Sequence, residues 1–326
     1  MQSILGIDVS KDTLDAILLI DHRRIHKVLS NDLKGHQLLE NWIIANQAGQ
    51  VHACLEATGQ YGEGIAEYLY DLQHKVSVVN PARIKRYGQS KLHRNKTDKA
   101  DAELISEFCW KEKPGLWKPH SPEMKHLRAL VRRSQDLKAQ LQQENNRLKS
   151  GEKNPWVLDD LSLNVVFLRG RIKAAENKIK EIIKQSDTLK TKHELLTSIP
   201  GIGLITASTL LAEVGDFSAF ESAPQLAAFA GLNPTNHRSG SSVYKKTRVS
   251  KEGRSELRAC LYMPALVALS WNPVIQDLAD RMMKSNHNKM EIVIAAMKKL
   301  LHLAYGVLKT QKPFDSDYGT QFNFSS

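Results

Sequence analysis

Three short stretches near the N-terminus decide the fold: SILGIDVS at residues 3–10, LDAILLI at 14–20 and RRIHKVLSN at 23–31. Each is apolar or alternates apolar with polar side chains, as β-strands do, and the turn SKDT separates the first two. Further along, KGHQLLENWIIANQ and YGEGIAEYLYDLQHK have helical spacing, whereas VHACLEATG and VSVVNP are typical of strands. A strand meander followed by alternating helix and strand predicts a mixed α/β domain over residues 1–118.

The whole chain has 326 residues, 41% hydrophobic and 25% charged, which is the composition of an ordinary globular protein. At about 100–200 residues per domain, this length predicts two or three domains. The 46 Lys and Arg residues against 35 Asp and Glu residues give a formal charge of +11. A surplus of this size permits a polyanionic partner without identifying it.

Several classes of protein are disfavoured by the sequence. Its apolar runs are shorter than the ~18 residues of a membrane span, and its start, MQSILGIDVSKD, has no signal-peptide layout. We therefore expect a cytoplasmic protein with no membrane partner. Cys54, Cys109 and Cys260 form no CxxC pair, and the 12 histidines show no HExxH motif, so neither a disulfide framework nor a zinc module is expected.

Residues 119–197 are dominated by helix formers with regular apolar spacing. From Ser121 to Leu148 leucines recur at helical intervals, and after the interruption SGEKNP a 4,3,4,3 spacing runs from Leu161 to Leu196. Most positions of the second run are apolar, which indicates a coiled-coil seam. This segment is either an intramolecular helical hairpin that turns at Gly151–Pro155 or a dimerisation arm, and the two are compatible.

The C-terminal segment, residues 198–326, is again mostly helical in pattern. At its start, Pro200-Gly201-Ile202-Gly203 links two helical stretches, an arrangement that looks like a helix-hairpin-helix. The glycines let the backbone approach a phosphate, and the free amides at the start of the second helix bind it without reading bases. A simple αα-hairpin is the alternative interpretation.

Four acidic residues in the N-terminal domain can share one edge of the predicted sheet. Asp8 and Glu56 each end a predicted strand, and Asp98 and Asp101 are three residues apart at the start of a predicted helix. Taken singly, each is also what a turn, a helix cap or a first helical turn contains. Together, four clustered anions repel one another unless cations lie between them, and hard oxygen ligands suit Mg²⁺.

Two Mg²⁺ ions at such a site would stabilise the attacking and the leaving oxygen of a phosphodiester. The segment from Arg83 to Lys99 has seven basic residues against the single acid Asp98, so it would bring a phosphate backbone to the metals. The residues therefore predict a nuclease-like metal site.

A second polar segment lies far away in the sequence. From Leu232 to Arg258 the chain has seven basic and two acidic residues around the hydroxyl-rich string RSGSSV. A serine hydroxyl is a poor nucleophile unless a base or a metal activates it. This segment would therefore need a metal site from the N-terminal domain or from another subunit, and a flexible surface loop is the alternative interpretation.

Seven separated strings resemble the DEDD insertion-sequence transposases and occur in that family's order: GIDVSKDTLD, CLEATGQY, NPARIKRYGQS, NKTDKADAELISEFC, SIPGIGLITASTLLAEVGD, AAFAGLNP and RSGSSV. The family includes the Piv/MooV-type DNA invertases and the bridge-RNA-guided recombinases, and the resemblance covers nearly the whole chain. It implies a RuvC-like (RNase H-like) N-terminal domain, a long coiled coil and a mostly helical transposase domain.

The resemblance also implies roles for single residues. The catalytic, metal-binding tetrad would be Asp8, Glu56, Asp98 and Asp101. The nucleophile would be Ser239, the serine directly before glycine, and its attack would store the phosphodiester energy in a phosphoserine, so no nucleotide cofactor is needed. From the two basic segments and the hairpin glycines, the positions expected to hold nucleic acid are Arg83, Lys85, Arg86, Arg94, Lys96, Gly201, Gly203, Arg238, Lys245, Lys246, Arg248, Lys251 and Arg254.

By the same resemblance, the partners would be donor and target DNA, a structured RNA from the element that pairs with both, and further copies of the chain in dimers and tetramers, in a bacterial cytoplasm. Three other functions stay open. They are a hydrolytic RuvC-like nuclease or junction resolvase, a non-catalytic nucleic-acid-binding scaffold, and a site-specific DNA invertase that uses the same chemistry.

Overall fold

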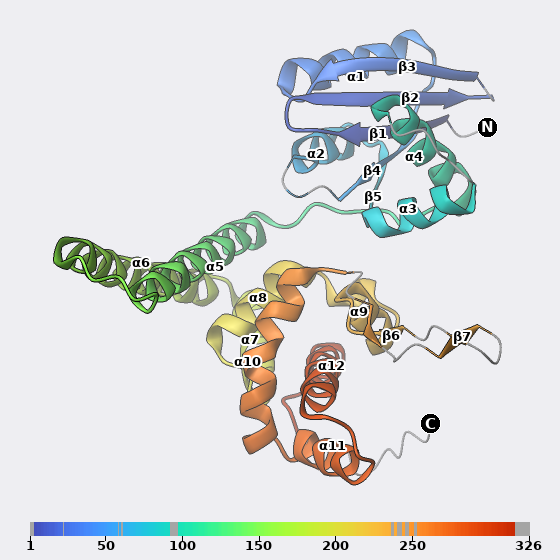
Figure 1. Cartoon of the computed structure of the whole chain (residues 1–326). Coiled ribbons are helices and arrows are strands. Elements are labelled where there is room, and N and C mark those ends of the chain that lie inside the picture. The colour runs from blue at the N-terminus through green and yellow to red at the C-terminus, as the bar shows by residue number, and fades with distance from the viewer. Residues whose placement is uncertain are drawn as a thin grey trace. The chain divides into compact units, whose positions relative to one another are not determined.

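The computed structural model describes residues 3–21, 23–57, 59, 61–91, 97–235, 238–239, 243–244, 248–250 and 253–316. Contacts divide the chain into two units, Met1–Pro119 and His120–Ser326, each drawn in Figure 1. The apolar cores lie within the units, two on the faces of a sheet in the first and a large helical one in the second.

The first unit is built on one mixed sheet with the strand order β3-β2-β1-β4-β5 (Figure 1). Its strands are β1 (Ser3–Val9), β2 (Thr13–Ile20), β3 (Arg23–Ser30), β4 (Val51–Glu56) and β5 (Lys75–Val79). The first three form an antiparallel meander, and β4 and β5 run parallel to β1. The mixed α/β sheet that the sequence predicts is confirmed.

Four helices cover the two faces of the sheet: α1 (Leu33–Ala45), α2 (Glu63–Asp71), α3 (Pro81–Ser90) and α4 (Asp98–Glu112). Alternate side chains of β1 point to opposite faces of the sheet. Leu5 and Ile7 pack with α1 and α2 on one face, whereas Ile4 packs with α3 and α4 on the other. The sequence pattern does not predict α3, because Pro81 closes the preceding strand. The same proline starts the helix, where it is favourable, and Asn80 caps it.

The second unit begins with two long helices, α5 (Pro122–Leu148) and α6 (Pro155–Gln185). They pack against each other, with Leu137 of α5 buried beside Leu168 and Ile172 of α6. The short link between them confirms the intramolecular hairpin, one of the two compatible arrangements that the sequence leaves open.

The predicted seam is wrong in its last third, because the second apolar run does not form one helix. The chain leaves the helical conformation at Ser186, whose φ is −118° and ψ 112°. The Ser186 side chain accepts a hydrogen bond from the Leu189 backbone N–H at 3.4 Å and so caps a new helix, α7 (Asp187–Thr197). Serine followed by aspartate is a favourable helix start, and the apolar residues beyond it join another core.

The rest of the second unit is mostly helical, as predicted. Its elements are α8 (Leu204–Val214), the 3₁₀ turn η1 (Phe217–Ala219), α9 (Ala223–Phe229), β6 (Pro234–Thr235), β7 (Arg238–Ser239), β8 (Val243–Tyr244), β9 (Arg248–Val249), α10 (Ser255–Trp271), α11 (Pro273–Lys284) and α12 (Lys289–Thr310). The last helix, α12, contacts α7, α9, α10 and α11. Within the part of the chain described above, no helix has the length and apolar character to cross a membrane.

Candidate functional site

Asp8 and Glu56 lie at the carboxyl ends of two neighbouring parallel strands. Asp8 is the next-to-last residue of β1, and Glu56 is the last residue of β4. The two strands pair with Ile7 opposite Leu55, so the two acids follow at the same level of the sheet. Because side chains alternate and Gly6 faces α4, both acids belong to the α4 face.

Helix α4 approaches β1 closely because Gly6 has no side chain. A Cβ atom at this position would lie 2.5 Å from the Ala102 carbonyl oxygen and 2.5 Å from the Ser106 backbone nitrogen. Real Cβ atoms do not come this near to a backbone, so a larger residue here requires the helix to move. The glycine therefore sets the distance between α4 and the strand that carries Asp8.

The first turn of α4 supplies the other two predicted acids. Thr97 caps the helix, since its hydroxyl oxygen accepts a hydrogen bond from the Ala100 N–H at 3.2 Å. Asp98 and Asp101 follow in the first turn, where negative charge also stabilises the helix dipole. We call Asp8, Glu56, Asp98 and Asp101 together the acidic edge.

The electrostatics of Asp8 show that these acids crowd one another. Burial, together with the smaller contributions of the negative charges of Asp101, Asp98 and Asp15, raises the pKa of the Asp8 carboxyl to about 6. A carboxylate with three anionic neighbours is stabilised by any cation that comes between them. The site therefore has the electrostatic character of a cation site.

Asp15 is a member of this environment that sequence reasoning missed. It lies directly opposite Asp8 on β2, and its carboxylate contacts His26 Nε2 at 2.9 Å. A signal was present in the sequence, because Asp15 is the one charged residue in the otherwise apolar strand TLDAILLI.

The acidic edge is not a closed metal cage. Among the described residues, which include all four acids, no three His, Cys, Asp or Glu side chains gather closely enough to hold a metal ion. Mg²⁺ is commonly held by one or two carboxylates, with water and substrate phosphate as its other ligands. Hard carboxylate oxygens around a crowded Asp8 fit such an ion, and substrate would complete its coordination.

Three of the basic residues predicted to hold nucleic acid lie on α3. Arg83, Lys85 and Arg86 are exposed, on a helix whose opposite face packs on α4 through Ile84. The Arg83 guanidinium lies 5.5 Å from the centre of the Phe108 ring. The predicted contacts Arg94, Lys96, Lys245, Lys246 and Lys251 lie outside the described residues.

The serine loop, residues 232–253, is fastened at its root by backbone contacts. Strand β6 pairs antiparallel with β9, and the Ser250 N–H donates to the Asn233 carbonyl at 2.9 Å. Gly253 packs so closely that a Cβ there would lie 2.4 Å from the Gly231 nitrogen and 2.5 Å from the Phe229 carbonyl oxygen. Both ends of the loop are thereby held to the turn after α9.

Ser239 lies in a second, outer pair of strands within this loop. It is the last residue of β7 and pairs with Val243 of β8, while Arg238 pairs with Tyr244. At these positions the backbone alone is described, as at Arg248 in β9. The nucleophile assigned by resemblance is thus part of the second unit, and the acidic edge is part of the first.

A buried charge cluster stands beside the root of the serine loop. The Glu213 carboxylate of α8, with no exposed side-chain surface, pairs with Arg254 Nη1 at 3.0 Å and with Arg132 Nε at 3.4 Å. The Arg254 guanidinium also lies 5.3 Å from the centre of the Phe229 ring. In the structure Arg254 forms an ion pair with Glu213 inside the second unit, and its contact with nucleic acid stays a prediction.

The two glycines of the predicted helix-hairpin-helix have different surroundings. Gly201 has a φ of 103° and faces α10, where an added Cβ would lie 2.8 Å from the Ala268 Cβ and 2.9 Å from the Pro264 carbonyl oxygen. Gly203 precedes α8, and apart from its chain neighbours no described residue has an atom within 4 Å of the position of its Cβ. The first glycine is therefore needed for packing, whereas the second leaves the start of α8 open.

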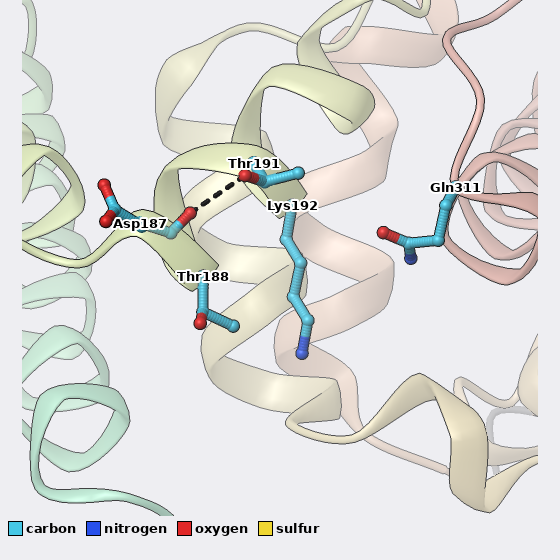
Figure 2. A pocket seen from close by; sticks show the side chains of 5 residues that line it. All are labelled: Asp187, Thr188, Thr191, Lys192 and Gln311. Carbon is cyan, nitrogen blue, oxygen red and sulfur yellow. Dashed lines mark hydrogen bonds between the residues drawn. The ribbon is translucent and has the colours of Figure 1, made fainter.

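A hollow lies at the start of α7. It is lined by Asp187, Thr188, Thr191, Lys192 and Gln311, as Figure 2 shows. The dashed line in that view is the hydrogen bond from the Thr191 hydroxyl to the Asp187 carbonyl, 2.9 Å long. None of the predicted site residues lies among its lining residues.

The first unit has a mixed sheet, with acids at the ends of two parallel strands and on the helix that packs across them. This arrangement defines an RNase H-like domain of the metal-dependent, phosphoryl-transferring class. Comparison with known proteins then gives the family. The family described as "Transposase IS116/IS110/IS902 family" matches residues 193–280, and the IS110-type DEDD transposase domain matches residues 5–151. The chain belongs to the IS110/IS116/IS902 family of DEDD transposases, and is thus a DNA-binding, DNA-cleaving phosphoryl-transfer enzyme whose domain type implies a divalent metal.

Relatives of two kinds are found. The chain is 36% identical over 317 residues to the pilin gene-inverting protein of Moraxella bovis, covering 96% of this chain and 98% of that protein, and equally similar to its counterpart in Moraxella lacunata. It is 25% identical over 285 residues to the transposase for insertion sequence element IS1111A of Coxiella burnetii, covering 79% and 75% of the two chains. Transposition and gene inversion are therefore both found among proteins similar to this one.

Proposed function

We propose that this chain cuts and rejoins DNA through a covalent phosphoserine at Ser239, with Mg²⁺ held by the acidic edge. The proposal is carried by the carboxylates that lie around Asp8 in a chain of a DNA-cleaving family. It is supported by the position of Ser239 on a strand of the basic serine loop. A cation would relieve the repulsion at the first site, and Ser239 would supply the nucleophile from the second.

The chemistry balances without a nucleotide cofactor. The Ser239 oxygen attacks phosphorus, the bond from phosphorus to the 3′ oxygen breaks, and the proton of the serine hydroxyl ends on the leaving 3′ oxygen. Attack of a 3′ hydroxyl on the phosphoserine reverses these steps and reseals a strand. Bound Mg²⁺, as one ion or two, would supply charge neutralisation at the phosphate.

The test is to trap the protein on cleaved DNA. A denaturation-resistant adduct is expected with the native chain and with the matched variants Ser241→Ala and Ser242→Ala, and is expected to vanish in Ser239→Ala. An adduct that persists in Ser239→Ala removes this residue from the role.

A hydrolytic nuclease is the alternative that uses the acidic edge alone. It predicts that Ser239→Ala cleaves DNA at the native rate and that no adduct forms with any variant. Site-specific inversion differs from transposition only in the arrangement of DNA sites, and the 36% identity to a pilin gene-inverting protein favours it as the biological outcome. A substrate with two inverted sites distinguishes the two by whether the segment between them is flipped.

We further propose that a structured RNA guides the choice of DNA sites. This proposal comes from the family resemblance, and the formal charge of +11 permits polyanionic partners without identifying them. Base pairing would then select sequence while the protein recognises backbone and shape. RNA that copurifies with the chain identifies the guide on sequencing, and full recombination by RNA-free protein contradicts it.

Self-association through α6 completes the proposal. Four apolar side chains on this helix are 62–74% exposed: Trp156, Leu163, Val166 and Phe167. Their spacing places them along one side of the helix, away from the buried seam with α5, as a second chain would require. We expect the double variant Leu163→Glu/Phe167→Glu to sediment at lower mass than the native dimer or tetramer; an unchanged mass rules this surface out.

A further inference from the structure

Asn31, between β3 and α1, joins two loops that are far apart in sequence. Its side-chain nitrogen donates hydrogen bonds to the Ser10 carbonyl at 2.9 Å and to the Tyr61 carbonyl at 3.1 Å. Its backbone N–H donates to the Asp12 carbonyl at 2.9 Å. One residue therefore binds the turn after β1 and the segment after β4.

The orientation of the Asn31 amide is fixed by these partners. Both contacts of its nitrogen are carbonyl oxygens, so the nitrogen and not the oxygen has to face them. The amide oxygen is then left to accept a hydrogen bond from His36 Nε2, which lies 3.2 Å away. His36 is buried, burial lowers its pKa, and its ring lies 5.5 Å from that of Tyr68. The packed imidazole, with hydrogen on Nε2, thus donates to the Asn31 oxygen and holds this side chain in place.

The two loops that Asn31 joins begin at the acidic edge. Ser10 is two residues after Asp8, and Tyr61 is five residues after Glu56. The pairing of β1 with β4 ends at Ile7, one residue before Asp8. Beyond that point the hydrogen bonds of Asn31 connect the two strand ends across the loops that follow them.

We propose that Asn31, held by His36, is a positioning residue for the metal site, because it sets the spacing between the loops that follow Asp8 and Glu56 and so between the two strand ends that carry these acids. The inference rests on the proposed metal site. It adds a residue that contacts neither metal nor DNA and yet controls the affinity for the ion. Second-sphere partners of metal ligands commonly change metal affinity by about 10–100-fold when removed.

The experiment measures Mn²⁺ binding to the full chain by calorimetry, beside DNA cleavage at low and saturating Mn²⁺. We expect Asn31→Ala to raise the dissociation constant for Mn²⁺ about tenfold, and saturating Mn²⁺ to restore most of the cleavage rate. The matched control is Asn46→Ala, which removes a similar bond, from Asn46 Nδ2 to the Trp42 carbonyl at 2.8 Å, at the other end of α1. This control is expected to bind Mn²⁺ as the native chain does.

A second pair of variants keeps the inference testable if Asn31→Ala does not fold. His36→Gln retains a donor toward the Asn31 oxygen and is expected to keep most of the metal affinity, whereas His36→Ala is expected to lose it. Native affinity in both Asn31→Ala and His36→Ala overturns the inference. If the native chain binds Mn²⁺ but Asp8→Asn and Glu56→Gln bind it equally well, the metal site itself is wrong, which is a different failure.

Discussion

The acidic edge and the serine loop each carry one half of the proposed chemistry, but the chain holds them by different means. The carboxylates lie on regular strands and a helix, where the register and the close approach at Gly6 set their positions. The serine lies in a loop of two-residue strands, held at its root by Gly253 and by the ion pair of Arg254 with Glu213.

The difference follows from what each half has to do. Carboxylates that share an ion need a fixed spacing, and a sheet edge provides one. A nucleophile has to reach a phosphate bound elsewhere, so a loop with a well-held root suits it. Variants that affect one half and not the other therefore test this division.

The largest effect on stability is expected from Glu213→Ala. It leaves two arginines without their buried partner, so the free energy of unfolding of the second unit should fall by about 3 kcal/mol, while Mn²⁺ binding to the first unit stays native. Urea unfolding measures the change. The control is Glu181→Ala, whose pair with Lys178 is exposed and should contribute about 0–1 kcal/mol. A loss below about 1 kcal/mol in Glu213→Ala would show that the cluster does not hold the loop.

A smaller loss is expected from Gly6→Ala. The added Cβ meets the backbone of α4, so the helix has to shift, at about 1–3 kcal/mol, and Mn²⁺ affinity should fall with it. Gly203→Ala is the matched change in the second unit, where the added atom meets open space. Because Gly203 is the N-cap of α8, where alanine is less favourable than glycine, the cost should be below about 1 kcal/mol. Equal losses in the two variants, read by thermal unfolding, would contradict the assigned packing role of Gly6.

The smallest effect, of opposite sign, is expected from Asp8→Asn without metal. The folded pKa of about 6 lies above the ordinary value of 3.8, so the folded state binds the proton more tightly and loses stability as pH rises through that window. Removing the charge should stabilise the metal-free chain by about 1 kcal/mol at pH 7, allowing for the solvent at this half-buried group.

The measurement is the unfolding midpoint against pH in a chelator, for the native chain and for this variant. The two midpoints should agree near pH 4, diverge as pH rises to about 6 and stay apart at higher pH, and added Mg²⁺ should stabilise the native chain alone. Parallel curves would mean that the charge of Asp8 does not destabilise the metal-free folded chain.

Much of the first unit could be predicted from the sequence, because alternation and helical spacing are local. The strand ends at Asp8 and Glu56 and the helix that begins at Asp98 are all where the pattern places them. The break at Ser186 was hidden, since a serine fits an exposed coiled-coil position as well as a helix cap.

Other features depend on contacts between distant segments, which no local pattern records. Glu213 looks like any helical glutamate in sequence, and its burial comes from arginines 81 and 41 residues away. Gly201 fits a phosphate-binding hairpin in sequence, but it packs on α10. The hydrogen bonds of Asn31 to two other loops are of the same kind.

The central claim is that the two halves act in one reaction, and the covalent DNA adduct tests it most directly. Adduct is measured for the native chain, Ser239→Ala and Asp8→Asn with Mg²⁺ present and equal DNA occupancy. The account predicts adduct with the native chain alone, and loss as complete in Asp8→Asn as in Ser239→Ala. Adduct formed by Asp8→Asn at the native rate would contradict it, because the serine would then act without the acidic edge.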